Sequence, residues 1–236
     1  MYFWSYDITY IVLVLPFVFL SLMASQNVKS TFRKYSDQYS RRGLTGAQAA
    51  QRVLHDNGIM DVSVQRIAGE LTDHYSDSEK VIRLSDHVYD STSTAAIGVA
   101  CHEAGHAIQS AKGYFPFKIR SAIIPLTYYG SRLAMPLILL GILFSFSGRF
   151  SAMMVNLGIA CFALSLILQL VTLPVEFDAS RRAMNCIRTS ELLTEEEMKG
   201  TRKTLSAAAL TYVAATALSF AQLARLLLLF RRRNSD

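Results

Sequence analysis

The stretch FSAMMVNLGIACFALSLILQLVTLPV, residues 150–175, contains no charged residue. A helix needs roughly 20 predominantly apolar residues to cross a bilayer, and this run is longer. Residues 8–28 and 204–224 are also free of charge, although 18% of the whole chain is charged. Such runs exclude a soluble globular protein, a disordered chain and a collagen-like fibre. The sequence therefore predicts a multi-pass membrane protein.

The charges outside the apolar runs predict its topology. Lys and Arg are dense between Lys29 and Arg42, and again between Arg181 and Lys203. Because cytoplasmic segments of membrane proteins carry the excess of Lys and Arg, both segments are expected in the cytoplasm. The membrane topology then explains the net charge of +6, because the excess Lys and Arg lie in the cytoplasmic segments. We therefore expect the lipid bilayer as a partner and no nucleic acid.

Four membrane helices are predicted. The first covers residues 8–24. A cleavable signal peptide typically has Lys or Arg before its apolar core, and none precedes this helix, so we expect a retained anchor. A hairpin follows, with helices at 121–147 and 151–173 joined at Ser147-Gly148-Arg149. Pro174 is expected to end its second helix, because proline interrupts helical hydrogen bonding. The fourth run, 204–230, either spans or is a re-entrant or interface helix, and we favour spanning.

The remaining segments predict a small α+β module. Thr45-Gly46-Ala47-Gln48 is a capping box that opens a helix, which closes near Gly58. Val81–Ser85 is a strand candidate, residues 95–111 are helical by composition, and Thr194 begins a second capping box. The predicted fold class is a mainly α-helical multi-pass membrane protein with a zincin-like α+β module at its cytoplasmic face. The predicted parts are an N-terminal anchor (1–28), the α+β module (29–120), a transmembrane hairpin (121–173), a cytoplasmic helical segment (174–203), and a fourth apolar helix with a basic tail (204–236).

The motif His102-Glu103-Ala104-Gly105-His106 carries the chemistry. Residues four apart share one face of a helix, so both imidazoles can reach one ion. Zinc accepts neutral imidazole nitrogen, and Glu103 stands where a general base can take a proton from water on the metal. A catalytic zinc normally has a third protein ligand, and the segment after the hairpin offers Glu176 and Asp178. Both ends of the hairpin lie on one side of the membrane, which allows that approach.

These motifs resemble the YugP-type membrane zinc metallopeptidases, which are similar in plan to the HtpX and CAAX-prenyl endopeptidase group. In that broader group a transmembrane hairpin follows HExxH, and an E-x-x-A-D motif then supplies the third ligand. Here Glu176-Phe177-Asp178-Ala179 matches the first four positions, so the resemblance implies Glu176 as that ligand. Ser180 replaces the final Asp, which orients a histidine in the relatives, and this role stays open to Ser180, Asp178 or neither. The YugP-type resemblance covers nearly the whole chain, including residues 71–75, 81–85, 101–109, 173–183 and 207–214. It also implies that the protein lies in a bacterial plasma membrane.

The same resemblance implies a substrate-binding role for one strand, and the positions of two other residues in the sequence make them candidates for catalysis. In zincins the strand before the metal helix is an exposed edge that pairs with an extended substrate, which here is Val81-Ile82-Arg83-Leu84-Ser85. A purely structural strand is the alternative. His74 is a candidate to approach the substrate oxyanion, and Arg181 a candidate to stabilise the tetrahedral intermediate. A surface histidine and a membrane-interface anchor are the respective alternatives.

The sequence thus predicts a membrane zinc endopeptidase with one Zn²⁺ per chain, acting on peptides or membrane proteins at the cytoplasmic face. A site-2-type intramembrane protease is the first alternative, but polar residues flank the metal helix and no Asp lies within a later apolar run. The second alternative is a non-catalytic membrane scaffold that binds zinc. No oligomeric state follows from the sequence.

Overall fold

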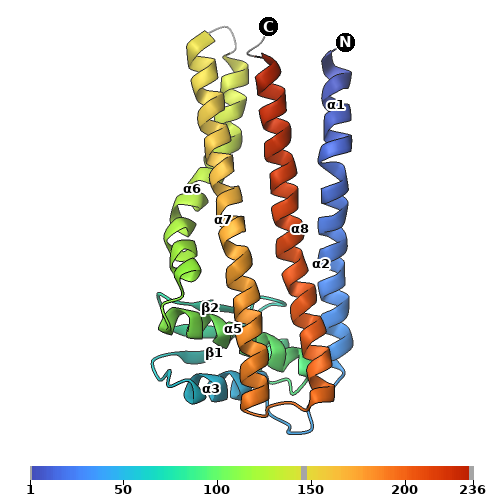
Figure 1. The fold of residues 1–236 in the computed structure, drawn as a ribbon, viewed down its shortest axis with the longest axis vertical. Coiled ribbons are helices and arrows are strands. Elements are labelled where there is room, and N and C mark those ends of the chain that lie inside the picture. The colour runs from blue at the N-terminus through green and yellow to red at the C-terminus, as the bar shows by residue number, and fades with distance from the viewer. Residues whose placement is uncertain (1, 145–147, 234–236) are drawn as a thin grey trace. The chain divides into compact units, whose positions relative to one another are not determined.

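The computed structural model describes residues 2–144 and 148–233 and divides into two compact units (Figure 1). The helical unit consists of Met1–Met23, Ile119–Leu173 and Tyr212–Asp236. The mixed unit consists of Ala24–Lys118 and Pro174–Thr211, and it contains the three strands of the described residues. This composition confirms the predicted class of a mainly helical membrane protein with a small α+β module.

Long helices build the helical unit. Four described helical segments are long and apolar enough to cross a membrane, which confirms the predicted number. They are Ile8–Ser36, Phe115–Leu143, Gly148–Thr189 and Glu195–Phe230. The helices that supply them are α1 (Tyr2–Leu13), α2 (Leu15–Ser36), α6 (Phe115–Leu143), α7 (Gly148–Thr189) and α8 (Glu195–Arg233).

Glycines allow α6 and α7 to pack closely within the helical unit. A Cβ on Gly141 would lie 2.6 Å from a methyl carbon of Val155, and one on Gly158 would lie 2.6 Å from Ile138. Small residues at such positions let membrane helices approach each other. Residues 145–147, including Ser147 of the predicted hairpin turn, lie outside the described residues.

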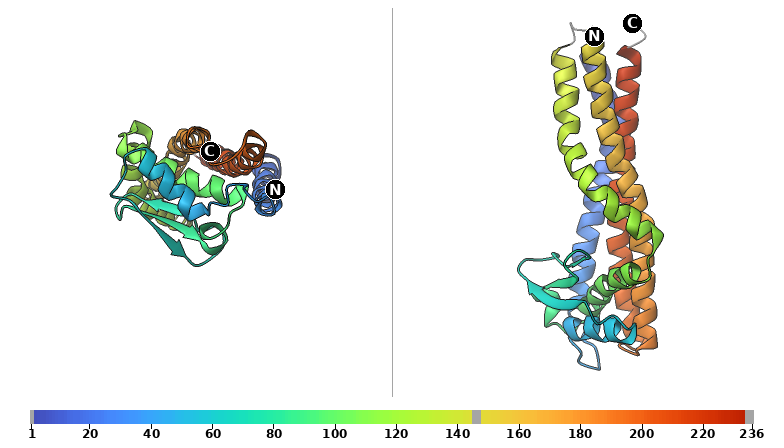
Figure 2. Two further views of the ribbon diagram at one scale, coloured as in Figure 1. Left: turned by 90° about the horizontal axis from the view of Figure 1, so that it is seen from below. Right: turned by 90° about the vertical axis from the view of Figure 1, so that its left-hand side faces the viewer.

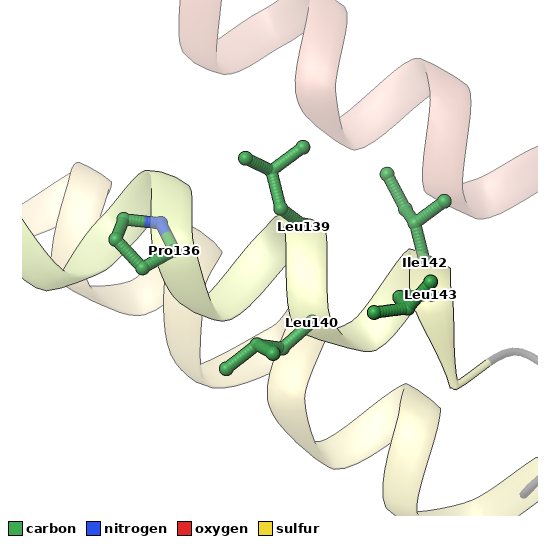
Figure 3. A pocket seen from close by; sticks show the side chains of 5 residues that line it. All are labelled: Pro136, Leu139, Leu140, Ile142 and Leu143. Atoms are coloured by element: carbon green, nitrogen blue, oxygen red, sulfur yellow. The ribbon is translucent and has the colours of Figure 1, made fainter.

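An apolar cavity of about 630 Å³ lies beside the second half of α6 (Figure 3). The side chains that line it are aliphatic, as expected of helix surfaces that face lipid tails or other apolar side chains. They belong to Pro136, Leu139, Leu140, Ile142 and Leu143.

The prediction that Pro174 ends the third membrane helix was wrong, because α7 continues through it to Thr189. Proline removes one backbone hydrogen bond and costs about 3 kcal/mol or more inside a helix. Burial on the far side of the proline offsets this cost. Four apolar residues spaced four apart on α7 have no exposed surface and form one buried stripe of the helix in the mixed unit. They are Val175, Ala179, Ala183 and Ile187.

Both predicted capping boxes are confirmed. At the start of α3 (Gly46–Asp56), the side chain of Thr45 accepts a hydrogen bond from the Gln48 backbone, and the side-chain oxygen of Gln48 accepts one from the Thr45 backbone. Gly58 follows this helix with a φ of +72°, a left-handed conformation that glycine adopts without strain. Thr194 and Glu197 form the same pair of bonds at the start of α8.

A three-stranded sheet lies in the mixed unit, with strand order β1-β3-β2. The strands are β1 (Ser63–Ile67), β2 (His74–Ser76) and β3 (Val81–Ser85). Strand β3 pairs in parallel with β1, from Ser63↔Val81 to Ile67↔Ser85. It pairs antiparallel with β2, from His74↔Arg83 to Ser76↔Val81.

The expectation that Val81-Ile82-Arg83-Leu84-Ser85 is an exposed edge was therefore wrong. This strand is the centre of the sheet, and four of its five residues are buried. Its β-branched and apolar side chains gain most from a central position, whereas the short, polar β2 tolerates an edge. Among the described strands, β2 has β3 on one side and no strand on the other.

The core of the mixed unit forms around helix α5 (Thr94–Ala111). Helices α3 and α5 pack on each other and on the sheet, and the short α4 (Asp86–Tyr89) joins β3 to α5 (Figure 2). Alanines dominate the buried face of α5, so neighbouring elements approach its backbone closely. The motif-bearing helix is thus held from several directions.

Candidate metal centre

Helix α5 positions the two histidines of the motif. Its N-cap is Ser93, whose hydroxyl accepts a hydrogen bond from the Ala96 backbone at 3.1 Å and satisfies one free donor of the first turn. His102 and His106 then lie one turn apart, with ring centroids separated by 4.8 Å and the ring planes at 83°. The predicted shared face is therefore present.

A close approach of α5 and α7 brings the third candidate ligand to these rings. Gly105 lies against the backbone of α7, and a Cβ there would be 2.7 Å from the carbonyl oxygen of Ala179. No real Cβ tolerates that distance, so the two helices pack this closely because residue 105 is glycine. Glu176 lies one turn before Ala179 and is delivered to the histidines by this contact.

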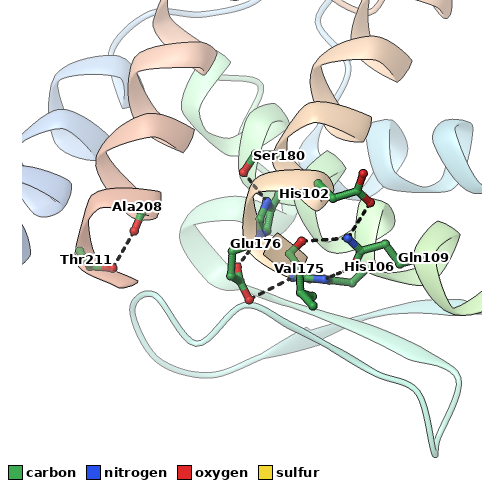
Figure 4. A network of polar contacts seen from close by, with 9 residues as sticks. His102, His106, Gln109, Val175, Glu176, Ser180, Ala208 and Thr211 are labelled. Carbon is green, nitrogen blue, oxygen red and sulfur yellow. Dashed lines mark hydrogen bonds and ion pairs between the residues drawn. The ribbon is translucent and has the colours of Figure 1, made fainter. Parts of the chain in front are cut away.

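The carboxylate of Glu176 reaches both imidazoles (Figure 4). One of its oxygens is 3.2 Å from His102 Nε2, and the other is 3.6 Å from His106 Nε2. The candidate ligand atoms of the three residues all lie within 4.8 Å of one another. Glu176 is 2% exposed, so a carboxylate here requires positive charge or hydrogen bonds close by.

This arrangement fits a zinc ion. A tetrahedral zinc with bonds of about 2.0–2.2 Å holds its ligand atoms roughly 3.3–3.5 Å apart, close to the separations of the Glu176 oxygens from the imidazole nitrogens. Two imidazole nitrogens and one carboxylate are also a donor set typical of catalytic zinc, which keeps a fourth position open. His102, His106 and Glu176 are therefore the residues that would hold the metal.

Glu103 is buried beside this cluster. Burial raises the pKa of its carboxyl to about 7, because the charged form loses its hydration. The neighbouring His102 and the backbone of Tyr75 in β2 lower the pKa, whereas the charge of Glu176 raises it. A carboxyl group that ionises near neutral pH can both accept and return a proton.

Ser180 is the residue that departs from the E-x-x-A-D motif, and it contacts a candidate ligand. Its hydroxyl lies 3.1 Å from Nδ1 of His102, on the side of the ring away from Glu176 (Figure 4). Asp178 has other partners. Its carboxylate accepts a hydrogen bond from Gln109 at 2.9 Å and forms an ion pair with Arg182 at 2.5 Å. Ser180, rather than Asp178, thus contacts His102.

Two further predicted residues have other partners. Arg181 forms an ion pair with Asp178, and its side chain is 71% exposed. His74 lies in β2, where its Nδ1 is 2.8 Å from the carbonyl oxygen of Thr72. These contacts favour a structural role for both residues. They do not support the roles of His74 at the substrate oxyanion and of Arg181 at the tetrahedral intermediate, which stay predictions.

Sequence reasoning missed Gln109. This side chain has no exposed surface, and its Oε1 lies 3.0 Å from Nδ1 of His106. A signal was available in the sequence, since a long polar residue three positions after His106 falls near the same face of a largely apolar helix.

The chain is similar to a known protein family and to a known bacterial protein. Residues 10–231 match the model of a family described as "Putative neutral zinc metallopeptidase". The chain is also 42% identical over 221 residues to a protein of Bacillus subtilis (strain 168) named "Putative membrane protease YugP". That alignment covers 94% of this chain and 96% of the relative. No solved structure matches the chain.

Proposed function

This chain belongs to the putative neutral zinc metallopeptidase family, and from that premise we propose that it is a membrane zinc endopeptidase that cleaves peptide bonds at the cytoplasmic face. The single observation that carries the proposal is the convergence of His102, His106 and Glu176 beside the buried Glu103. One zinc ion per chain satisfies this donor set.

The residues have separate tasks in the proposed reaction. His102, His106 and Glu176 hold the metal, and zinc, when bound, polarises a carbonyl group and makes water more acidic. Glu103 accepts the proton of the attacking water as the new C–O bond forms. It then passes that proton to the amine that leaves when the C–N bond breaks. A carboxyl pKa raised to about 7 by burial suits both transfers.

The free edge of β2 is the proposed place for the substrate backbone. An extended peptide can add to an open strand edge through main-chain hydrogen bonds, with little dependence on its side chains. The backbone of Tyr75 in β2 is near enough to Glu103 to influence its pKa, so a peptide on this edge would run past the proposed base. This assignment replaces the one made for β3.

A site within the bilayer is disfavoured by the position of the motif. Helix α5 is not among the four candidate membrane spans of the described chain. The scaffold alternative predicts zinc binding without hydrolysis, so turnover is the deciding measurement.

The central test compares Glu103→Gln with Glu70→Gln, which alters an exposed loop residue. In purified protein in detergent, Glu103→Gln should keep one equivalent of zinc and lose hydrolysis of a library of quenched peptides. Glu70→Gln should retain both properties. Unchanged hydrolysis by Glu103→Gln would overturn the assignment of the base, and zinc without hydrolysis in the wild type would favour the scaffold.

Orientation needs its own measurement. A cysteine introduced at the exposed Gln51 of the mixed unit should react with a membrane-impermeant maleimide in inverted vesicles and not in right-side-out vesicles. The parent chain, with its three native cysteines, gives the background. The reverse labelling pattern would refute the cytoplasmic location.

A further inference from the structure

Gln109 is a fully buried amide in the last turns of α5. Burying an amide without hydrogen-bond partners costs several kcal/mol relative to water, so its neighbours reveal what it does. Its Nε2 donates to the carbonyl oxygen of Val175 at 2.8 Å and to the carboxylate of Asp178 at 2.9 Å. Its Oε1 lies 3.0 Å from His106 Nδ1. Both hydrogens of the amide nitrogen are used.

These partners fix which way the amide points. The Val175 carbonyl accepts hydrogen bonds and cannot donate them, so it must face the nitrogen of Gln109. The Asp178 carboxylate, which also forms ion pairs with Arg182 and Arg181, is the second acceptor for this nitrogen. The oxygen of Gln109 therefore faces His106.

The orientation of the amide determines the tautomer of His106. An amide oxygen has no hydrogen to donate, so Nδ1 of His106 must carry the hydrogen of this bond. Nε2 of His106 is then left with a lone pair, and it is the nitrogen that faces Glu176 at 3.6 Å. A neutral imidazole in this form is ready to bind a metal.

His102 provides a contrast within the same cluster. Its Nδ1 contacts the hydroxyl of Ser180, which can either donate or accept a hydrogen bond. Ser180 therefore does not determine the tautomer of His102. The constraint on His106 comes from Gln109 and is specific to that ring.

Gln109 also joins two parts of the site that are distant in sequence. Val175 directly precedes Glu176, and Asp178 follows it by two residues. The amide nitrogen thus bonds to both flanks of the third candidate ligand, while the amide oxygen bonds to the second histidine.

We propose that Gln109 is a positioning residue that fixes His106 as the Nδ1–H tautomer and joins it to the Glu176 segment, so that both present their ligand atoms to one metal ion. This inference rests on the zinc-binding part of the proposed function and is independent of hydrolysis. Gln109 does not contact the reacting atoms in this scheme.

The first test is spectroscopic and uses the wild-type chain. Histidine ¹⁵N chemical shifts of the metal-free protein, measured in detergent at about pH 8.5 where unperturbed imidazole is neutral, distinguish the two tautomers. His106 should show a protonated Nδ1. Gln109→Met removes the acceptor and should release the ring to a mixture of forms. Gln109→Glu loses both donated bonds, to Val175 and Asp178, but keeps an acceptor for His106. Protonated Nδ1 should therefore return in this variant although its fold is destabilised, which a purely structural role for Gln109 would not predict.

The second test measures zinc affinity by competition with a chelator. Gln109→Met should bind zinc roughly tenfold to hundredfold more weakly, as found when partners of metal-binding histidines are removed. Gln51→Met, at an exposed site on α3, is the matched control and should bind zinc as the wild type does. An unprotonated Nδ1 on wild-type His106, or affinity of Gln109→Met within about twofold of wild type, would overturn the inference. Tautomer and affinity as expected, without any hydrolysis, would refute the proposed function alone.

Discussion

Gly105→Ala should move the third candidate ligand away from the histidines. The new methyl group would lie 2.7 Å from the carbonyl oxygen of Ala179, and this oxygen belongs to the helix backbone and cannot rotate away. Ordinary van der Waals contact begins near 3.4 Å, so α5 and α7 must separate locally by about 0.7 Å. Metal–ligand distances tolerate changes of only about 0.2 Å. The displacement therefore exceeds what zinc coordination tolerates, but it is small enough for the fold to absorb.

The expected cost in stability is correspondingly modest. Overpacking of one methyl group in a dense core costs about 1–3 kcal/mol. Alanine recovers up to about 1 kcal/mol, because it favours the helix more than glycine does. The net loss in the free energy of unfolding is then about 0–3 kcal/mol, and the variant should still fold. Its zinc affinity should fall roughly tenfold or more, comparable to losing a residue that orients a ligand.

Gly98→Ala is the matched control for this experiment. Gly98 lies on the same helix, and a Cβ there would lie 2.7 Å from a methyl carbon of Thr201 on α8, a helix that carries none of the candidate ligands. Both variants should lower the thermal unfolding midpoint in detergent, and Gly105→Ala alone should weaken zinc in a chelator competition. Equal zinc affinities for the two variants would refute the argument that the approach at residue 105 positions Glu176.

Three further predictions concern individual side chains. Ser180→Asp should strengthen zinc binding several-fold in the same competition, because a carboxylate accepts a stronger, charge-assisted hydrogen bond from His102 Nδ1; weaker binding would contradict this role. Thr45→Ala should lower the free energy of unfolding by about 1 kcal/mol through loss of the cap, with zinc affinity unchanged. Burial raises the pKa of Asp73 above 3.8 despite its bonds to Ser85, so its protonated form stabilises the fold in acid and this contribution is lost as the pH rises through the folded-state pKa. Asp73→Asn should therefore gain stability relative to wild type between acidic and neutral pH, as followed by thermal unfolding, and a constant difference across that range would exclude the effect.

The membrane helices and the histidine pair could be predicted because each depends on local sequence. Uncharged runs such as residues 150–175 satisfy the length rule for a bilayer wherever they occur in a chain. The spacing of His102 and His106 fixes their shared helix face in the same way. Capping boxes at Thr45 and Thr194 are equally local, and both formed as predicted.

The errors arose where tertiary packing decides the outcome. Pro174 is a strong local signal for a helix end, but the buried stripe that begins at Val175 keeps α7 helical. The strand Val81–Ser85 was predicted correctly as a strand and wrongly as an edge. Its position depends on β1 and β2 both pairing with it, and no property of its own five residues specifies how many neighbours it has.

The two imidazoles of the candidate centre are held by partners of different kinds, and this difference has a chemical consequence. Gln109 presents an acceptor to His106, so that ring already has the lone pair on Nε2 that a metal requires. Ser180 offers His102 a hydroxyl that fits either tautomer, so metal binding itself must select the form of His102. In the wider group an Asp at this position would make that selection beforehand. We therefore expect serine at position 180 to give a lower affinity for zinc than Asp would, with the same three metal ligands. Gln109→Met should lower the affinity for zinc, and Ser180→Asp should raise it.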